Sequence, residues 1–171
     1  QLVTVYARLL QTGKTYPLGG FQPLPRPELA HDAPKVLIFS PHPDDECIIG
    51  ALPLRLMREA RMSVVDVAVS QGSNKDRHAG RFRELENACF HLGFGLLSIG
   101  ASGLEGINPE TREKDRAHWS ECVKIIAEIL RNNQPRVVFF PHEQDWNSTH
   151  IGTHFLVMDA LKAMPVGFEC Y

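Results

Sequence analysis

Residues 35–46 read KVLIFSPHPDDE, and this stretch decides the fold. Its first six residues (35–40) form a short apolar run that ends at a proline, which predicts a buried strand. The apolar residues from Glu46 to Ala60 then follow helical spacing, and Pro53 either kinks this helix or lies in its first turn. A buried strand that leads into a helix opens a βαβ unit.

The same alternation of strands and helices continues along the chain. Strands are expected at 63–70, 95–99 (the weakest) and 136–140, helices at 81–92, 117–132 and 150–163, and polar loops at 71–80 and 101–116. Helices of this length between strands predict an α/β fold of the Rossmann-like kind. We therefore expect a mostly parallel sheet with helices on both faces.

The chain of 171 residues is long enough for one domain. Five prolines and a glycine pair between residues 17 and 34 predict that residues 1–34 form an extended arm. Residues 35–171 then form the domain. Residues 167–171 have the pattern of a further strand that stops, so we expect the domain to be truncated at its C-terminus.

Composition excludes several classes of function. The net charge is −2 and no run is rich in Lys or Arg, which argues against nucleic-acid binding. No apolar stretch approaches the roughly 20 residues of a membrane span, and no signal peptide opens the chain. Four cysteines without a CxxC pair favour a reduced, cytoplasmic setting. A homo-oligomer is compatible with these features, and the sequence does not fix the oligomeric state.

The chemistry is expected where the first strand ends, because ligands of open α/β sheets bind at the carboxyl ends of the strands. A nucleotide-binding domain would place a glycine-rich turn there. This chain has His42 followed by Asp44, Asp45 and Glu46. One acid alone could cap a helix, but three adjacent acids repel one another unless a cation neutralises them. The stretch therefore predicts a metal site.

Histidine and carboxylate ligands are typical of catalytic zinc, which has three protein ligands and an open fourth position. His42 and Asp45 are three residues apart and can face one point at a tight turn. Asp44 then points elsewhere and remains free as a base. Glu46 is expected to cap the helix or support the ligands.

The third ligand should follow the strand at 136–140. His150 and His154 are four residues apart and can share one helix face, and His142 directly follows the proline that closes the strand. Spacing alone does not choose between His150 and His154; we favour His150, and His142 could also reach the site.

Two motifs resemble those of the LmbE-like, or PIG-L, family of zinc-dependent de-N-acetylases. The first is SPHPDDE at 40–46. The second is the pattern formed by Arg81, Glu84, Ala88, Leu92 and Gly93. The resemblance extends over about residues 35–163, and it implies a Rossmann-like sheet domain.

The resemblance also implies the roles of individual residues. His42, Asp45 and His150 match the ligands of one Zn²⁺ per chain, Asp44 matches the general base, and Arg81 matches a position that binds substrate. The implied substrate is a small-molecule amide, an N-acetylated amino sugar or its conjugate. The implied activity is that of a metal-dependent amidase, in which a metal-activated water removes the acetyl group.

One segment departs from the family pattern. Many bacterial members have His-Pro-Asp-His before the last helix, where this chain has Asn147-Ser148-Thr149-His150. Asn147 can donate a hydrogen bond to an oxyanion but cannot act as an acid. The proton for the leaving amine must then come from Asp44, or from His142 or His154. Asp145 is a further supporting candidate.

Two other functions compete with this one. The first is another metal-dependent hydrolase such as a phosphoesterase, although a two-metal site needs more bridging carboxylates than this loop supplies. The second is an inactive sugar- or metal-binding relative. Asn147 favours the second alternative, whereas a spare base beside the ligands, Asp44, argues against it.

Overall fold

The computed structural model describes residues 2–13 and 25–171. The helices and strands of the main body alternate along the chain. They are β1 (Lys35–Ser40), α2 (Asp45–Ile48), α3 (Ala51–Glu59), β2 (Ser63–Ala68), the 3₁₀ helix η1 (Lys75–Arg77), α4 (His78–Leu92), β3 (Gly95–Ser98), α5 (Pro109–Lys114), α6 (Arg116–Asn133), β4 (Val137–Phe139) and α7 (Ser148–Lys162).

The four strands form one parallel sheet in the order β3-β2-β1-β4. Strand β1 lies between β2 and β4, so the strand that precedes the HPDDE turn has a neighbour on each side. The predicted α/β fold with a parallel sheet is confirmed.

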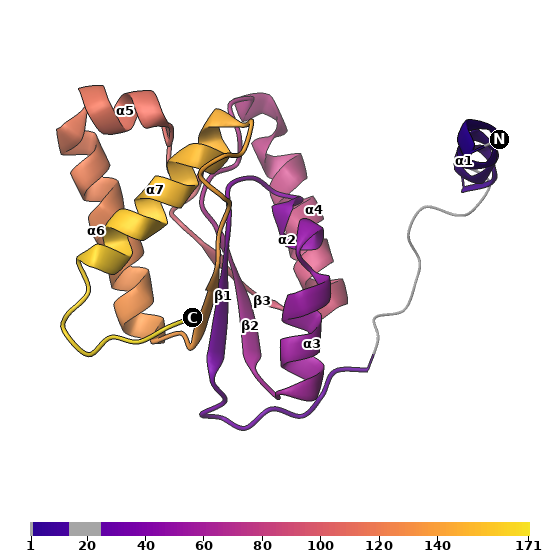
Figure 1. The fold of residues 1–171 in the computed structure, drawn as a ribbon, viewed down its shortest axis with the longest axis horizontal. Helices are drawn as coiled ribbons and strands as arrows, with labels where there is room; N and C mark the ends of the chain where they lie inside the picture. Colours follow the sequence, from indigo (N-terminus) through magenta and orange to yellow (C-terminus); the bar gives the residue numbers. More distant parts are fainter. Residues whose placement is uncertain (1, 14–24) are drawn as a thin grey trace.

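Helices cover both faces of this sheet, as Figure 1 shows. Side chains alternate between the two faces of a strand, and both sets in β1 are buried. Leu37 and Phe39 pack with α6 and α7 on one face. Val36 and Ile38 pack with α3 and α4 on the other. A strand that is apolar on both faces suits the centre of a covered parallel sheet.

The helix expected at 46–60 is divided into α2 and α3, which are separated by Ile49 and Gly50. Pro53 is the third residue of α3. The first turn of a helix has no internal acceptors for its amide groups, so a proline is tolerated there. The first-turn alternative for Pro53 is therefore the correct one. The short α2 is the element that carries Asp45.

Two segments differ from the prediction. The arm expected to be extended over 1–34 contains a helix, α1 (Leu2–Gly13), seen apart from the main body in Figure 1. The prolines that suggested an extended arm all follow this helix. Residues 14–24 lie outside the described residues, and 25–34 have no regular secondary structure. The boundary at residue 35 stays a prediction.

The second difference is in the loop expected at 101–116, which contains α5. Asn108 caps this helix by accepting a hydrogen bond from the Thr111 amide at 2.9 Å, and Pro109 is its first residue. Both are strong helix-start signals that the glycines nearby obscured.

Helix α5 is tied to α7 by an ion pair. Arg112 donates two hydrogen bonds, of 2.9 and 3.0 Å, to the carboxylate of Asp159, and Trp119 of α6 donates another of 3.1 Å. The guanidinium of Arg112 also lies 4.3 Å from the centre of the Phe155 ring. This network joins the three helices on the face that carries α7.

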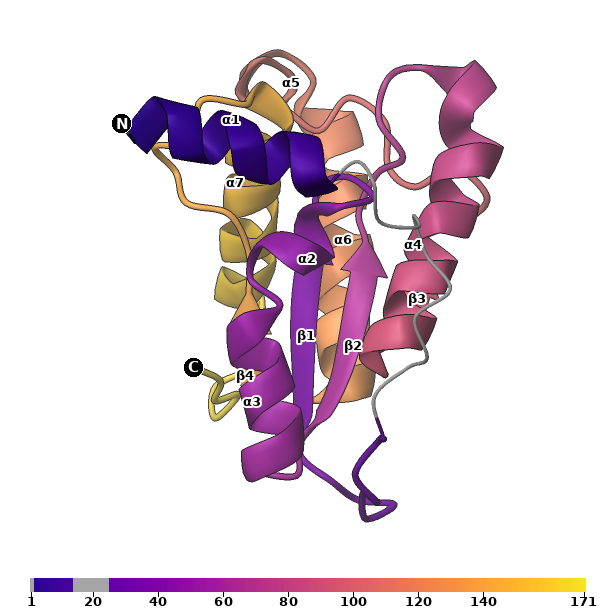
Figure 2. The same cartoon turned by 90° about the vertical axis from the view of Figure 1, so that its right-hand side faces the viewer.

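At the free edge of β4, the backbone of Tyr171 exchanges two hydrogen bonds with the strand. The Val138 amide donates to the Tyr171 carbonyl at 2.8 Å, and the Tyr171 amide donates to the Arg136 carbonyl at 3.0 Å. The strand expected over 167–171 is otherwise absent from these described residues. Figure 2 shows the chain ending beside β4.

Candidate active site and metal centre

The site lies where the chain leaves β1 and β4. After β1 the chain passes to the face that carries α2 and α3, and after β4 it passes to the face that carries α7. Two adjacent parallel strands whose connections leave to opposite faces open a crevice at their carboxyl ends. The HPDDE turn and the segment before α7 therefore meet there.

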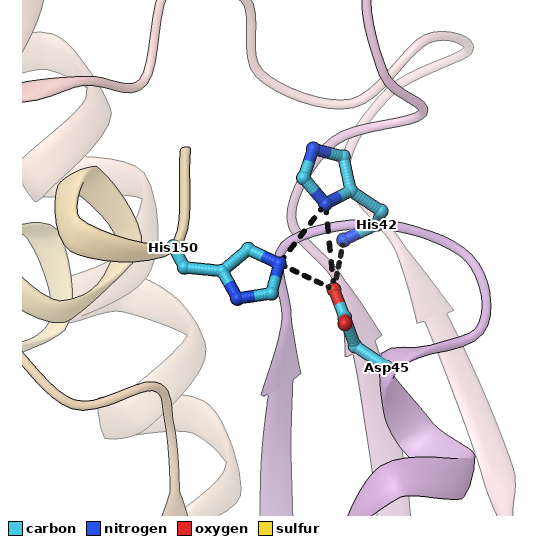
Figure 3. Close-up of side chains that lie close together, drawn as sticks. All are labelled: His42, Asp45 and His150. Atoms are coloured by element: carbon cyan, nitrogen blue, oxygen red, sulfur yellow. Dashed lines mark hydrogen bonds and ion pairs between the residues drawn. The ribbon is translucent and has the colours of Figure 1, made fainter. Parts of the chain in front are cut away.

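Three of the predicted ligands converge in this crevice (Figure 3). Asp45 Oδ2 lies 3.5 Å from His42 Nδ1 and 3.3 Å from His150 Nε2, and the two imidazole nitrogens are 3.3 Å apart. The three side chains are 10–17% exposed. A carboxylate and two imidazoles thus point at one place from segments more than 100 residues apart.

These separations fit a metal ion. Ligand atoms about 2.1 Å from a tetrahedral centre stand about 3.4 Å from one another, and two histidines with a carboxylate are a known set for catalytic zinc. Within residues 2–13 and 25–171, this is the one group of three or more His, Cys, Asp or Glu side chains whose ligand atoms lie close enough together to hold an ion. The donor set and its geometry therefore suit a single divalent cation.

Backbone contacts fix Asp45 in this position. Its Oδ2 accepts a hydrogen bond of 2.8 Å from the His42 amide, and its own amide donates to the His42 carbonyl at 3.3 Å. These two hydrogen bonds close the turn between His42 and Asp45, so the first two candidate ligands form one local unit.

His150 lies in the first turn of α7 and is oriented by a second carboxylate. Its Nδ1 is 3.1 Å from Asp145 Oδ2, while its Nε2 faces the cluster. A hydrogen bond from the Asn147 amide, aided by the bond to His150, lowers the pKa of the Asp145 carboxyl. An ionised Asp145 accepts a hydrogen bond from the Nδ1–H group of His150, which leaves the lone pair of Nε2 free to bind a cation.

The other two histidines occupy different places. His142 lines the cavity beside the cluster, and its Nδ1 accepts a hydrogen bond of 3.2 Å from the Gln144 amide. His154 donates from Nδ1 to the Pro141 carbonyl at 2.9 Å and packs beside the Phe140 ring. The structure thus brings His150, and not His154, into the cluster.

Asp44 stands next to the cluster without belonging to it. Its side chain is 77% exposed and lines the same cavity. Its backbone has a φ of 116°, a region that non-glycine residues rarely adopt. The buried Glu46 supports this backbone, because its Oε2 accepts a hydrogen bond of 2.8 Å from the Asp44 amide. Glu46 thus contacts the backbone of Asp44, and its expected support of the ligands stays a prediction.

Arg81 braces the same turn from α4. One guanidinium nitrogen donates to the Pro43 carbonyl at 2.9 Å and lies 3.5 Å from Asp44 Oδ2. Gly72, at a φ of +82°, makes room for it, since a Cβ there would lie 2.9 Å from the other guanidinium nitrogen. Arg81 lines the cavity, so substrate binding remains a prediction beside this bracing contact.

Asn147 caps α7. Its Oδ1 accepts a hydrogen bond of 2.8 Å from the Thr149 amide, and the residue lines the cavity. The group that it can offer to a ligand is therefore the Nδ2 amide.

The cavity has a volume of about 680 Å³, within the range of small-molecule sites. Its polar end holds the cluster described above. The rest of its wall is largely apolar and includes Ile48, Ile49, Phe139, Phe140, Pro141 and Trp146. No helix among the described residues is both long and apolar enough to cross a membrane.

Sequence reasoning missed one buried acid beneath the site. Asp66 in β2 is completely buried; its Oδ1 accepts a hydrogen bond from the Ser40 hydroxyl, and its Oδ2 has no partner among the described residues. Burial raises the pKa of the Asp66 carboxyl to about 7; the hydrogen bond from Ser40 opposes this shift, and the charges of Glu46 and Asp45 add to it. An acid inside an apolar strand was the available signal.

A family model described as PIG-L, GlcNAc-PI de-N-acetylase, matches residues 37–161. The chain belongs to this family. The match covers both motifs and all the residues of the cluster. No curated protein matches the chain.

Several solved structures share the PIG-L fold of this chain. The N,N'-diacetylchitobiose deacetylase of Pyrococcus horikoshii is 24% identical, with a TM-score of 0.59, over 80% of this chain and 53% of its own. A zinc-inhibited teicoplanin deacetylase is 17% identical, also with a TM-score of 0.59, over 75% and 63%.

A third structure, the 4-carboxy-2-hydroxymuconate hydratase of Pseudomonas putida, is 20% identical, with a TM-score of 0.59, over 79% and 59%. Its name describes a hydratase, so resemblance at this level establishes the fold and leaves the reaction to the site. The chain spans between half and two thirds of the length of these three proteins.

Proposed function

We propose that the protein is a metal-dependent N-deacetylase that hydrolyses the acetamide of an amino sugar or its conjugate. One observation carries this proposal. His42, Asp45 and His150 converge at separations suited to one cation, and a carboxylate outside the cluster, Asp44, lines the same cavity. Membership of the de-N-acetylase family supports the same reaction.

Zinc is the ion that we propose for the cluster, at one per chain. A divalent ion held there lowers the pKa of a water molecule and polarises an amide carbonyl. Asp145 keeps His150 in the tautomer that leaves Nε2 unprotonated.

The residues around the cluster supply the proton transfers. Asp44 accepts the proton of the attacking water. The Nδ2 group of Asn147 donates a hydrogen bond to the amide oxygen as negative charge develops on it. His142 is the histidine at the cavity that can pass a proton to the leaving amine, with Asp44 as the other source. The amide C–N bond breaks, and acetate and a free amine leave.

The competing functions have less support. A two-metal phosphoesterase needs two groups of metal ligands. The residues that the structure describes provide a single such group. An inactive binding module needs no spare carboxylate such as Asp44. A cytoplasmic location and the identity of the sugar remain predictions.

The test combines metal content with amine release. We expect one zinc per chain, chelator-sensitive release of amine from N-acetylglucosamine conjugates, loss of zinc in His150→Ala and retention of zinc in His154→Ala. Asp44→Asn should keep the zinc and lose turnover. A stoichiometry of two ions, or unchanged turnover in Asp44→Asn, would overturn the proposal.

A further inference from the structure

Two large apolar side chains stand exposed at the cavity that holds the cluster. Trp146 is 91% exposed and Ile48 is 75% exposed, and both line that cavity. Neither belongs to the two hydrophobic cores of the described chain. Exposed apolar surface that borders a cavity is typical of a ligand-binding groove.

The backbone on each side of Trp146 is fixed by the site itself. The Asp145 carboxylate accepts a hydrogen bond from the Asn147 amide and contacts His150 Nδ1. Asn147 in turn caps α7. Ile48 ends α2, three residues after Asp45. Both apolar side chains therefore project from segments that also carry groups of the cluster.

The size of the surface limits what can occupy it. Two side chains at a cavity of about 680 Å³ suit part of a small molecule. A stable protein partner would need an interface of about 1,000 Å² or more. The surface is also continuous with the proposed active site, so the group that covers it belongs to the substrate.

The burial of the cavity wall indicates which half of the substrate contacts Trp146 and Ile48. Phe39 and Ser40 form a buried floor at the end of β1, whereas Trp146 and Ile48 form an exposed rim. A small acetyl group needs only the enclosed floor. The amine-bearing half is larger, leaves after hydrolysis and must extend toward the rim.

We propose that the substrate carries an apolar aglycone, an alkyl or aryl group on the amino sugar, and that Trp146 and Ile48 bind it. This inference rests on the proposed function for the placement of the amide. It makes Trp146 a specificity-determining residue, because an indole can bury 150–250 Å² against such a group.

The test compares octyl and methyl β-glucosaminide, both free amines, by calorimetry on the zinc-loaded protein below micellar concentration. We expect the octyl compound to bind more tightly, and Trp146→Ala to weaken its binding by about tenfold while the methyl compound is unaffected. Trp146→Phe should recover much of the loss. Val166→Ser, a change at another exposed apolar residue that does not line this cavity, should have no effect. Unchanged zinc binding shows that each variant is folded.

Equal binding of the two compounds, or equal weakening of both by Trp146→Ala, would overturn the inference. Dependence on Trp146 for N-octanoylglucosamine but not for the octyl glycoside would place the acyl half at the rim and would overturn it too. Turnover of the N-acetylated pair is measured separately. If neither is hydrolysed while octyl binding still depends on Trp146, the deacetylase proposal fails and the apolar subsite stands.

Discussion

Asp145 Oδ2 lies 3.1 Å from Nδ1 of His150, so the imidazole that faces the cluster is held from behind by a carboxylate. Outer partners of this kind typically change metal affinity by roughly 10–100-fold. We expect Asp145→Asn to weaken zinc binding by that amount in a competition titration. Glu143→Gln, an exposed change two residues away, is the control and should bind zinc normally. Equal affinity in both variants would mean that Asp145 does not orient the ligand.

His142 and His154 offer a matched pair for locating the acid. Because His142 lines the cavity and His154 donates to the Pro141 carbonyl, we expect His142→Gln to lower kcat by about 100-fold and to alter the alkaline limb of the pH profile. His154→Gln should keep a kcat close to that of the unchanged protein. A normal pH profile in His142→Gln would leave Asp44 as the only source of the proton.

Asp66 should make stability depend on pH in the metal-free protein. Burial raises the pKa of Asp66 from its usual 3.8 to about 7 in the folded protein. Between these two pH values the folded protein therefore binds more protons than the unfolded chain. The contribution of Asp66 to stability is then largest below about pH 4, falls as the pH rises and is lost above about pH 7. The slope approaches about 1.4 kcal/mol per pH unit at most.

Asp66→Asn keeps an acceptor for Ser40 and cannot titrate, so its denaturant midpoint should vary less between pH 4 and 7. Asp32→Asn, at an exposed position, should follow the unchanged protein. A pH dependence that survives in Asp66→Asn would assign the effect to another group.

Asp159 joins α5, α6 and α7, and its removal should destabilise the fold. Asp159→Ala leaves Arg112 and Trp119 without their shared acceptor, and we expect a loss of about 2–3 kcal/mol in urea unfolding. Lys162 lies 3.6 Å from the same carboxylate with its side chain largely exposed. Lys162→Ala should therefore cost less than about 1 kcal/mol. Equal losses in the two variants would contradict this account of the network.

The parts of the fold that could be predicted from sequence are those with a strong local signal. The run at 35–40 is apolar on both faces and ends at a proline, so both β1 and the HPDDE turn that follows it could be predicted. The α5 helix was missed because its Asn-Pro start stands among glycines. The α1 helix was missed because prolines further along suggested an extended arm.

The site shows a similar limit. His42 and Asp45 are three residues apart at one turn, so their approach to a single point could be predicted from the sequence. The role of Asp44 as a base stays a prediction. The choice between His150 and His154 depends on which turn of α7 faces β1, and sequence spacing does not contain that information. Trp146 and Asp66 were missed for a related reason, since their importance lies in exposure and burial, which only the folded chain reveals.

The pairing of β1 with β4 has a consequence for assembly. The two strands are separated by about 100 residues, and until they dock the chain presents only the His42–Asp45 half of the chelating group. If the cluster binds zinc as proposed, tight binding requires that β4 has already paired with β1. Zinc uptake during refolding should then be a late event, coincident with the burial of the sheet centre.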